Sequence, residues 1–110
     1  MIDLVSTPVT DASLEMAAKD KDCILAFWEQ NCPHCIEMIP IVETLAGKYR
    51  NALSLLTARK QDVEQTGFDM KIAGFPTFVF LKQGKETGRF QGSTDSETFE
   101  NWIKARLQEG

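Results

Sequence analysis

Hydrophobic runs of strand length alternate along the chain with segments whose apolar residues recur at helical spacing. The run 23–28 is apolar throughout, as in a strand buried on both faces of a parallel sheet. The run 77–81 is rich in β-branched and aromatic residues, and 53–57 also has strand character. Shorter candidates lie at 2–5 and near 88–91. The pattern therefore predicts about five strands.

The segments between these runs predict four helices, at 11–19, 33–49, 62–70 and from 94 onward. Thr10 is placed to cap the first helix, whose expected apolar side consists of Leu14, Met16, Ala17 and Ala18. The last helix begins with the capping-box spacing of Thr94 and Glu97. Its inward-facing residues are expected to be Phe99, Trp102, Ile103 and Leu107.

The longest predicted helix begins at Pro33 and ends near Tyr49. Proline suits the first helical position because its missing N–H would have no partner there. The apolar residues at helical spacing are Ile36, Ile39, Val42, Leu45 and Ala46. Pro40 removes a backbone hydrogen bond inside the helix, so we expect a kink at this position.

The resulting order, β-α-β-α-β-α-β-β-α, is typical of an α/β fold with a central sheet. The turn 82–85 joins the last two strands into an antiparallel hairpin, which makes the predicted sheet mixed. The length of 110 residues suits a single domain, 1–110.

Composition narrows the function classes. Apolar residues make up 43% of the chain, enough for one packed core, and the net charge of −4 comes from scattered acidic residues. The lysines and arginines form no basic stripe, which argues against nucleic-acid binding. No run approaches the ~20 apolar residues of a membrane helix. The start of the chain lacks the pattern of a secretory signal, so we expect a cytoplasmic protein. A monomer is the default expectation for the oligomeric state.

The sequence Cys32-Pro33-His34-Cys35 follows a buried strand and opens a helix. Disulfide exchange requires a thiolate, and the unpaired N–H groups at a helix N-terminus stabilise a negative sulfur. Cys32 is therefore the expected nucleophile, and Cys35, one turn later, is the expected resolving thiol. An imidazolium at His34 would stabilise the Cys32 thiolate further and make the disulfide more oxidising.

Other interpretations of the cysteines are weaker. A zinc site needs two more ligands, and only Cys23 and His34 remain as candidates beside the pair. Covalent haem attachment needs a histidine directly after the second cysteine, where Ile36 stands instead. Cys23 lies in an apolar run and is expected to be a core residue. We expect no metal and no cofactor other than the redox-active Cys32–Cys35 pair.

From Cys23 to the C-terminus, the chain resembles the thioredoxin family. The resemblance rests on 27–28, the cysteine pair, Pro40, 74–77, 82–84 and 91–92. It implies the thioredoxin fold and an enzyme that exchanges disulfides with protein substrates, with thioredoxin reductase as a partner. It also implies that Pro76 is cis and lies against the cysteine pair. The implied peptide-binding groove comprises Asn31, Pro33, His34, Phe75, Pro76, Gln91 and Gly92, with Trp28 near it.

Three departures from the family pattern are visible. Thioredoxins usually have tryptophan before the first cysteine, where this chain has Asn31, and the usual dipeptide between the cysteines is Gly-Pro. Pro33-His34 is instead the pair of the more oxidising DsbA-type enzymes. The buried acid and nearby lysine of thioredoxins correspond to Ala26 and Thr57 here. Without that acid, deprotonation of Cys35 would fall to water, His34 or a carboxylate such as Glu29.

Several functions stay open at this point. A thioredoxin-like protein with an oxidising couple is the first interpretation. A DsbA-like oxidase or isomerase is favoured by the dipeptide but opposed by the length, because no helical insertion fits between Thr57 and Gly74. A glutaredoxin-like enzyme is a weaker alternative, because such enzymes are usually shorter and have Pro-Tyr between their cysteines. A binding module with incidental thiols is a further alternative.

Overall fold

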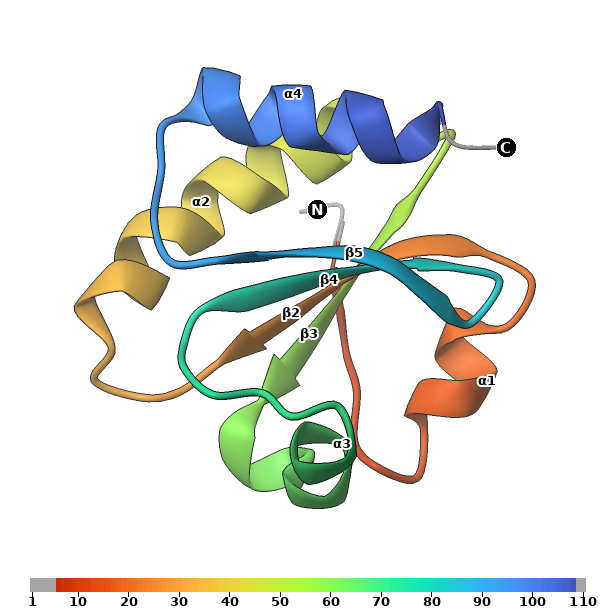
Figure 1. The fold of residues 1–110 in the computed structure, drawn as a ribbon, viewed down its shortest axis with the longest axis vertical. Coiled ribbons are helices and arrows are strands. Elements are labelled where there is room, and N and C mark those ends of the chain that lie inside the picture. Colours follow the sequence, from red (N-terminus) through yellow and green to blue (C-terminus); the bar gives the residue numbers. More distant parts are fainter. Residues whose placement is uncertain (1–5, 109–110) are drawn as a thin grey trace, which may run out of the picture.

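The computed structural model describes residues 6–108 and contains a five-stranded mixed sheet in the order β1-β3-β2-β4-β5 (Figure 1). The strands are β1 (Ser6–Pro8), β2 (Asp22–Trp28), β3 (Ser54–Arg59), β4 (Thr77–Lys82) and β5 (Lys85–Gln91). The helices are α1 (Leu14–Ala18), α2 (Pro33–Lys48), α3 (Glu64–Asp69) and α4 (Ser96–Leu107), with a short 3-10 helix at Lys60–Asp62. The fold is the predicted α/β thioredoxin fold.

Strand β2 lies at the centre of the sheet. It pairs in parallel with β3 and antiparallel with β4, and all of its residues from Cys23 to Phe27 are buried. Burial on both faces explains why its sequence is apolar throughout rather than alternating. Residues Gln83 and Gly84 form the two-residue turn between β4 and β5, and both have positive φ. This turn geometry matches the right-handed twist of a tight hairpin.

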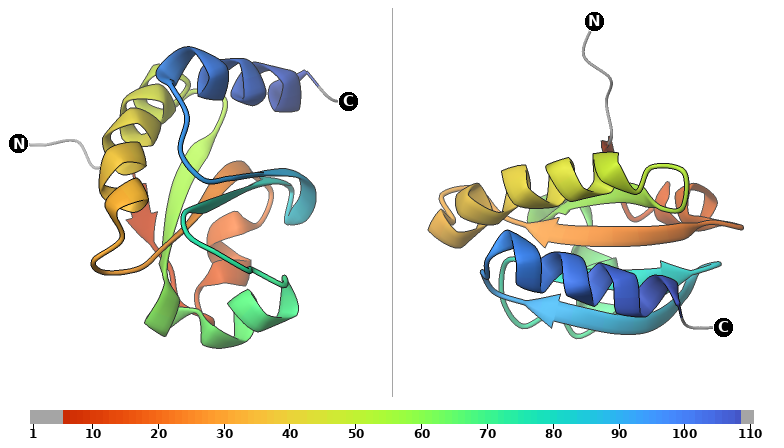
Figure 2. Two further views of the ribbon diagram at one scale, coloured as in Figure 1. Left: turned by 60° about the vertical axis from the view of Figure 1, so that its left-hand side comes forward. Right: turned by 90° about the horizontal axis from the view of Figure 1, so that it is seen from above.

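Helices α2 and α4 cover one face of the sheet, and α1 and α3 cover the other (Figures 1 and 2). The core under α2 and α4 contains Phe78, Phe80 and Phe99, with Phe90 and Trp102 packed against it. Several of these rings meet edge to face, such as Phe78 and Phe99 at a centroid distance of 5.0 Å. The second core, under α1 and α3, contains Cys23, Leu25 and Val79. Helix α2 is thus anchored through Met38, Val42, Leu45 and Ala46 in a core to which α4 contributes Phe99 and Ile103.

Several element boundaries differ from the sequence prediction. The strand predicted at 2–5 lies outside the described residues, and the observed first strand is β1. The helix predicted at 11–19 is shorter, because Thr10 caps a turn through its hydroxyl and the Ser13 N–H, and α1 begins only at Leu14. Strand β3 ends two residues later than predicted, and β5 starts earlier, at Lys85.

Two residues expected to face inward are exposed. Met16 is 75% exposed and Ile36 is 70% exposed. On α2 the buried residues are Cys35, Met38, Val42, Leu45 and Ala46, so the apolar stripe begins at Cys35 and leaves Ile36 outside it. The prediction for Ile36 is wrong because Cys35 packs in the core as a small apolar side chain, which turns Ile36 toward solvent.

The last helix also begins differently. Asp95, not Thr94, is the N-cap of α4, and its carboxylate accepts a hydrogen bond from the Thr98 N–H at 2.7 Å. The backbone N–H of Thr94 instead donates to the sulfur of Met38 at 3.3 Å. Within residues 6–108, no helix is long and apolar enough to cross a membrane.

Candidate active site

The two cysteines lie where β2 ends and α2 begins. Cys32 is the N-cap of α2, and Pro33 occupies the first helical position, as the sequence predicts. Asn31 precedes the cap with φ of 60°. Asparagine is one of the few residues that tolerate this left-handed conformation, so Asn31 suits the turn that leads into the N-cap Cys32.

Cys32 and Cys35 form a disulfide with a Cα–Cα distance of 5.2 Å. The backbone N–H of Cys35 donates to the Cys32 sulfur at 3.2 Å, and the N–H of Ile36 donates to the Cys32 carbonyl oxygen at 3.1 Å. Cys32 is 6% exposed and Cys35 is 1% exposed. The outer sulfur therefore already receives the hydrogen bond that would stabilise a thiolate, while Cys35 is shielded beneath it.

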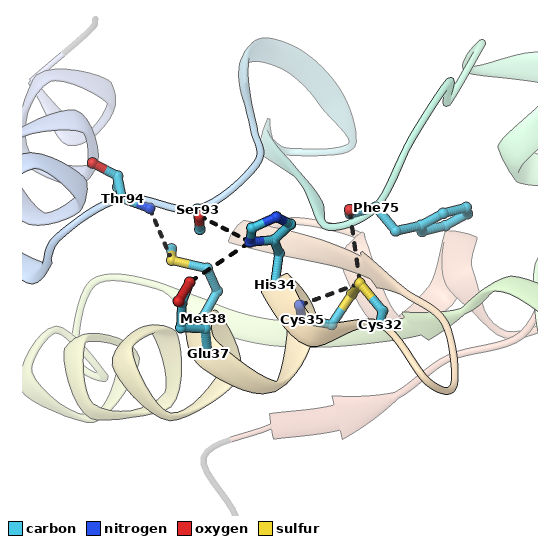
Figure 3. Close-up of polar contacts among 8 residues, drawn as sticks. All are labelled: Cys32, His34, Cys35, Glu37, Met38, Phe75, Ser93 and Thr94. Atoms are coloured by element: carbon cyan, nitrogen blue, oxygen red, sulfur yellow. Dashed lines mark hydrogen bonds and ion pairs between the residues drawn. A yellow bond between two sulfur atoms is a disulfide. The ribbon is translucent and has the colours of Figure 1, made fainter.

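His34 lies on the exposed side of the same helical turn, with 65% of its side chain accessible. Its Nδ1 lies 3.2 Å from the hydroxyl oxygen of Ser93 and 3.7 Å from the Glu37 carboxylate (Figure 3). Within residues 6–108, the polar contacts of His34 go to these two residues and not to either cysteine. Direct support of the Cys32 thiolate by the imidazole stays a prediction.

The loop before β4 approaches the disulfide from the other side. The Phe75–Pro76 peptide bond is cis, and the Phe75 carbonyl oxygen lies 3.8 Å from the Cys32 sulfur (Figure 3). The cis bond that the family resemblance implied is therefore confirmed. The Thr77 hydroxyl donates to the Gly74 carbonyl oxygen at 2.7 Å and closes this loop on itself.

The segment after β5 completes the surroundings of the pair. Gly92 has φ of 91°, and its N–H donates to the Pro76 carbonyl oxygen at 2.9 Å. Gln91 pairs with Thr77 across the hairpin, and its amide lies so close to Gly74 that a Cβ there would be 2.8 Å from Nε2. The structure thus joins the segment after β5 to the cis-proline loop, and within that loop Phe75 contacts Cys32.

Trp28 ends β2 and is half-buried. After it, Glu29 forms an ion pair with Lys60 at 3.5 Å, and the Lys60 ammonium lies 5.7 Å from the centre of the Phe75 ring. Glu29 is thus engaged by a cation across the loop. Within the described residues, no polar contact joins its carboxylate to Cys35.

A hollow of about 320 Å³ opens on the far side of Phe75 from the disulfide. Its lining residues are largely apolar and come from the end of β2, from α3 and from the loop before β4: Phe27, Lys60, Val63, Glu64, Gly67, Phe68, Ile72, Ala73 and Phe75. Phe68 is 70% exposed at this hollow. The hollow therefore places a largely apolar surface between Phe75 and α3.

The two positions at which the family resemblance implied a buried acid and its lysine are neighbours in the sheet. Ala26 on β2 pairs with Thr57 on β3, and Ala26 is 3% exposed in the core that contains Met38 of α2. Cys23 lies in the other core with no accessible surface, and burial raises the pKa of its thiol. Its expected role as a core residue is confirmed. Within residues 6–108, no group of three or more histidine, cysteine or carboxylate residues could hold a metal ion.

Sequence reasoning missed four residues around the site: Glu37, Lys60, Phe68 and Ser93. Glu37 could have been found, because it lies three residues after His34 and so on the same side of a helix. Ser93 is 59 residues from His34 in the chain, and only the fold brings them together. Phe68 lies in a segment whose polar composition gave no sign of an exposed ring.

Comparisons with known proteins agree with this geometry. The thioredoxin family model matches residues 5–105. Thioredoxin-1 of Drosophila melanogaster is 34% identical over 79 residues, which are 72% of this chain and 74% of that protein. Protein disulfide isomerase-like 2-1 of Oryza sativa subsp. japonica is 28% identical over 106 residues, 94% of this chain and 29% of the relative. Protein disulfide-isomerase of Saccharomyces cerevisiae is 32% identical over 87 residues, 76% of this chain and 17% of the relative.

Proposed function

Because the chain belongs to the thioredoxin family, we propose that its Cys32–Cys35 pair exchanges disulfides with protein substrates. The observation that carries the proposal is the position of Cys32. Its sulfur caps α2 and accepts the Cys35 N–H at 3.2 Å, which favours the thiolate that exchange requires. No metal or organic cofactor is needed, since the dithiol itself carries the electrons.

Reduction of a substrate follows from this arrangement. The Cys32 thiolate attacks one sulfur of the substrate disulfide, a Cys32–substrate S–S bond forms, and the other substrate sulfur leaves as a thiolate. Cys35, deprotonated in turn, attacks the Cys32 sulfur. The Cys32–Cys35 disulfide forms and the second substrate thiolate leaves, so two electrons pass to the substrate. Oxidation of a substrate dithiol is the same sequence in reverse.

We propose that the substrate backbone runs past Pro76, with Asn31, Phe75, Gln91 and Gly92 beside it. The Phe75 carbonyl oxygen lies 3.8 Å from the Cys32 sulfur. In the proposed complex this oxygen faces the substrate backbone. Asn31 and His34 make the surface next to the nucleophile more polar than an aromatic residue would. This polarity favours partners that differ from those of ordinary thioredoxins.

We also propose that the couple is more oxidising than that of ordinary thioredoxins. Support comes from the helix N-cap position of Cys32 and from a histidine two residues later, whose protonated ring adds positive charge to the same turn. Thiolate stabilisation favours the reduced form and raises the reduction potential. A DsbA-like role in forming disulfides is the second candidate function, and the Pro33-His34 dipeptide is the observation that favours it.

Two cysteine variants test the exchange reaction with insulin as the disulfide substrate and dithiothreitol as the reductant. We expect Cys32→Ser to abolish catalysed reduction. Cys35→Ser should instead trap a mixed disulfide between Cys32 and the substrate, visible by mass spectrometry. Full activity of Cys32→Ser would disprove the assignment of the nucleophile, and Cys23→Ser is the control that leaves the pair intact.

The direction of the reaction is tested by the reduction potential, measured by equilibration in glutathione buffers. A value above that of ordinary thioredoxins supports an oxidising role, and an equal value supports a reductant. We further propose thioredoxin reductase as the electron donor. NADPH consumption by purified thioredoxin reductase in the presence of the oxidised chain is the expected result, and no consumption would remove that partner.

A further inference from the structure

The segment after β5 is tied to the active-site helix and to the cis-proline loop. The Gly92 N–H donates to the Pro76 carbonyl oxygen at 2.9 Å, and the Thr94 N–H donates to the Met38 sulfur at 3.3 Å. Ser93 lies between these two anchored residues. Its backbone is therefore held on both sides. Its hydroxyl can contact the first turn of α2 without the entropy cost of ordering a mobile loop.

The hydroxyl meets the imidazole of His34. The Ser93 oxygen is 3.2 Å from Nδ1, and a Glu37 carboxylate oxygen is 3.7 Å from the same nitrogen (Figure 3). Both oxygens can accept a hydrogen bond, so together they favour a proton on Nδ1.

Resting on the function proposed above, we propose that Ser93 is a positioning residue for the dithiol. It holds the His34 ring, through Nδ1, toward the segment after β5, and thereby keeps the imidazolium charge from approaching the Cys32 sulfur. A hydrogen bond of ordinary strength shifts a side-chain equilibrium by about two- to tenfold. Ser93 therefore limits how far His34 lowers the Cys32 pKa and how oxidising the disulfide becomes.

Glu37, the charged residue in contact with His34, also weakens the effect of the imidazolium on the Cys32 pKa. Glu37 lies on α2, one turn after His34, and its carboxylate partly offsets the imidazolium charge. From the segment after β5, the next charged residue is Asp95, whose carboxylate is engaged by the Thr98 N–H. Ser93 is thus the neutral contact whose removal frees the ring without changing the charge of the site.

The test measures the Cys32 pKa from thiolate absorbance near 240 nm, after reduction with a phosphine. We expect Ser93→Ala to lower this pKa by about 0.5–1 unit, as the freed imidazolium approaches the sulfur. The disulfide should become correspondingly easier to reduce in glutathione buffers. Ser93→Thr, which keeps the hydroxyl, should retain the original pKa, and so should the matched control Thr94→Ala, which keeps its backbone N–H.

A double variant separates positioning from a structural effect. In a His34→Ala background, Ser93→Ala should change the Cys32 pKa no further. The inference is overturned if Ser93→Ala leaves the pKa unchanged, raises it, or lowers it equally with and without His34. Phosphine reduction makes the pKa measurable without protein turnover. Failure of the wild-type pair to exchange with any disulfide would therefore overturn the proposed function, while the pKa comparison would still decide the role of Ser93.

Discussion

Ala26 and Thr57 lie directly opposite each other in the parallel pairing of β2 and β3. These are the positions at which the family resemblance places a buried acid and its lysine. With Ala26 and Thr57 at these positions, the site holds a methyl group and a hydroxyl, and neither residue carries a charge that needs a partner. Replacement of a whole buried charge pair costs little stability, whereas one member left alone costs much. A charge at only one of these two positions should therefore destabilise the fold.

Restoring only the acid should destabilise the protein. We expect Ala26→Asp to cost about 3–5 kcal/mol of unfolding free energy in urea, the range for an uncompensated buried charge. Ala26→Asp combined with Thr57→Lys should recover part of that loss. If the restored acid assists Cys35, the double variant should also resolve mixed disulfides faster near neutral pH. Equal stability of the single and double variants would contradict the pairing argument.

The left-handed backbone of Asn31 makes a second prediction. At φ of 60°, a residue with an ordinary Cβ is strained. Asn31→Ala should therefore lower the unfolding free energy by about 0.5–1 kcal/mol, while Asn31→Gly should be neutral or stabilising. Asn101→Ala, at an exposed position of helix α4, is the matched control and should stabilise slightly because alanine favours helices. Urea unfolding of the oxidised proteins measures all three, and a loss on Asn31→Gly larger than on Asn31→Ala would rule out the backbone explanation.

Much of the fold and the cysteine pair could be predicted from local sequence patterns. The buried run of β2 and the Cys32-to-Cys35 spacing express constraints between residues near in the chain. Phe75–Pro76 was expected to be cis only through the family resemblance, because X-Pro bonds are mostly trans. The contact between His34 and Ser93 had no local signal, since two separate elements must pack before it forms.

The start of α4 gives a third prediction, with a definite pH dependence. The Thr98 backbone N–H, followed by its side chain, holds the pKa of Asp95 below its ordinary value. A lowered folded-state pKa means that the carboxylate stabilises the fold above the ordinary pKa, near 3.9, and that this contribution is lost as pH falls through the folded value. Asp95→Ala should therefore lower the urea midpoint at pH 7, while Thr94→Ala should leave it nearly unchanged.

Asp95→Asn can still cap α4, and should lose less stability than the wild type between pH 5 and the folded pKa of Asp95. Identical acid profiles for the wild type and Asp95→Asn would contradict this assignment.

The exposed ring at the hollow beside Phe75 gives the last prediction. Phe68 and Met16 are both large apolar residues, 70% and 75% exposed, but only Phe68 lines the hollow. Because Phe68 is already largely solvated, Phe68→Ala should change the unfolding free energy by less than about 0.5 kcal/mol. If a substrate side chain rests on this ring, the same variant should raise KM for a protein disulfide by about three- to tenfold, with kcat retained. Met16→Ala should change neither the unfolding free energy nor KM.

Steady-state reduction of insulin separates KM from kcat, and equal KM values for Phe68→Ala and Met16→Ala would place the substrate away from α3. A drop in kcat with KM unchanged would instead show that Phe68 supports the geometry of the cysteine pair through Phe75.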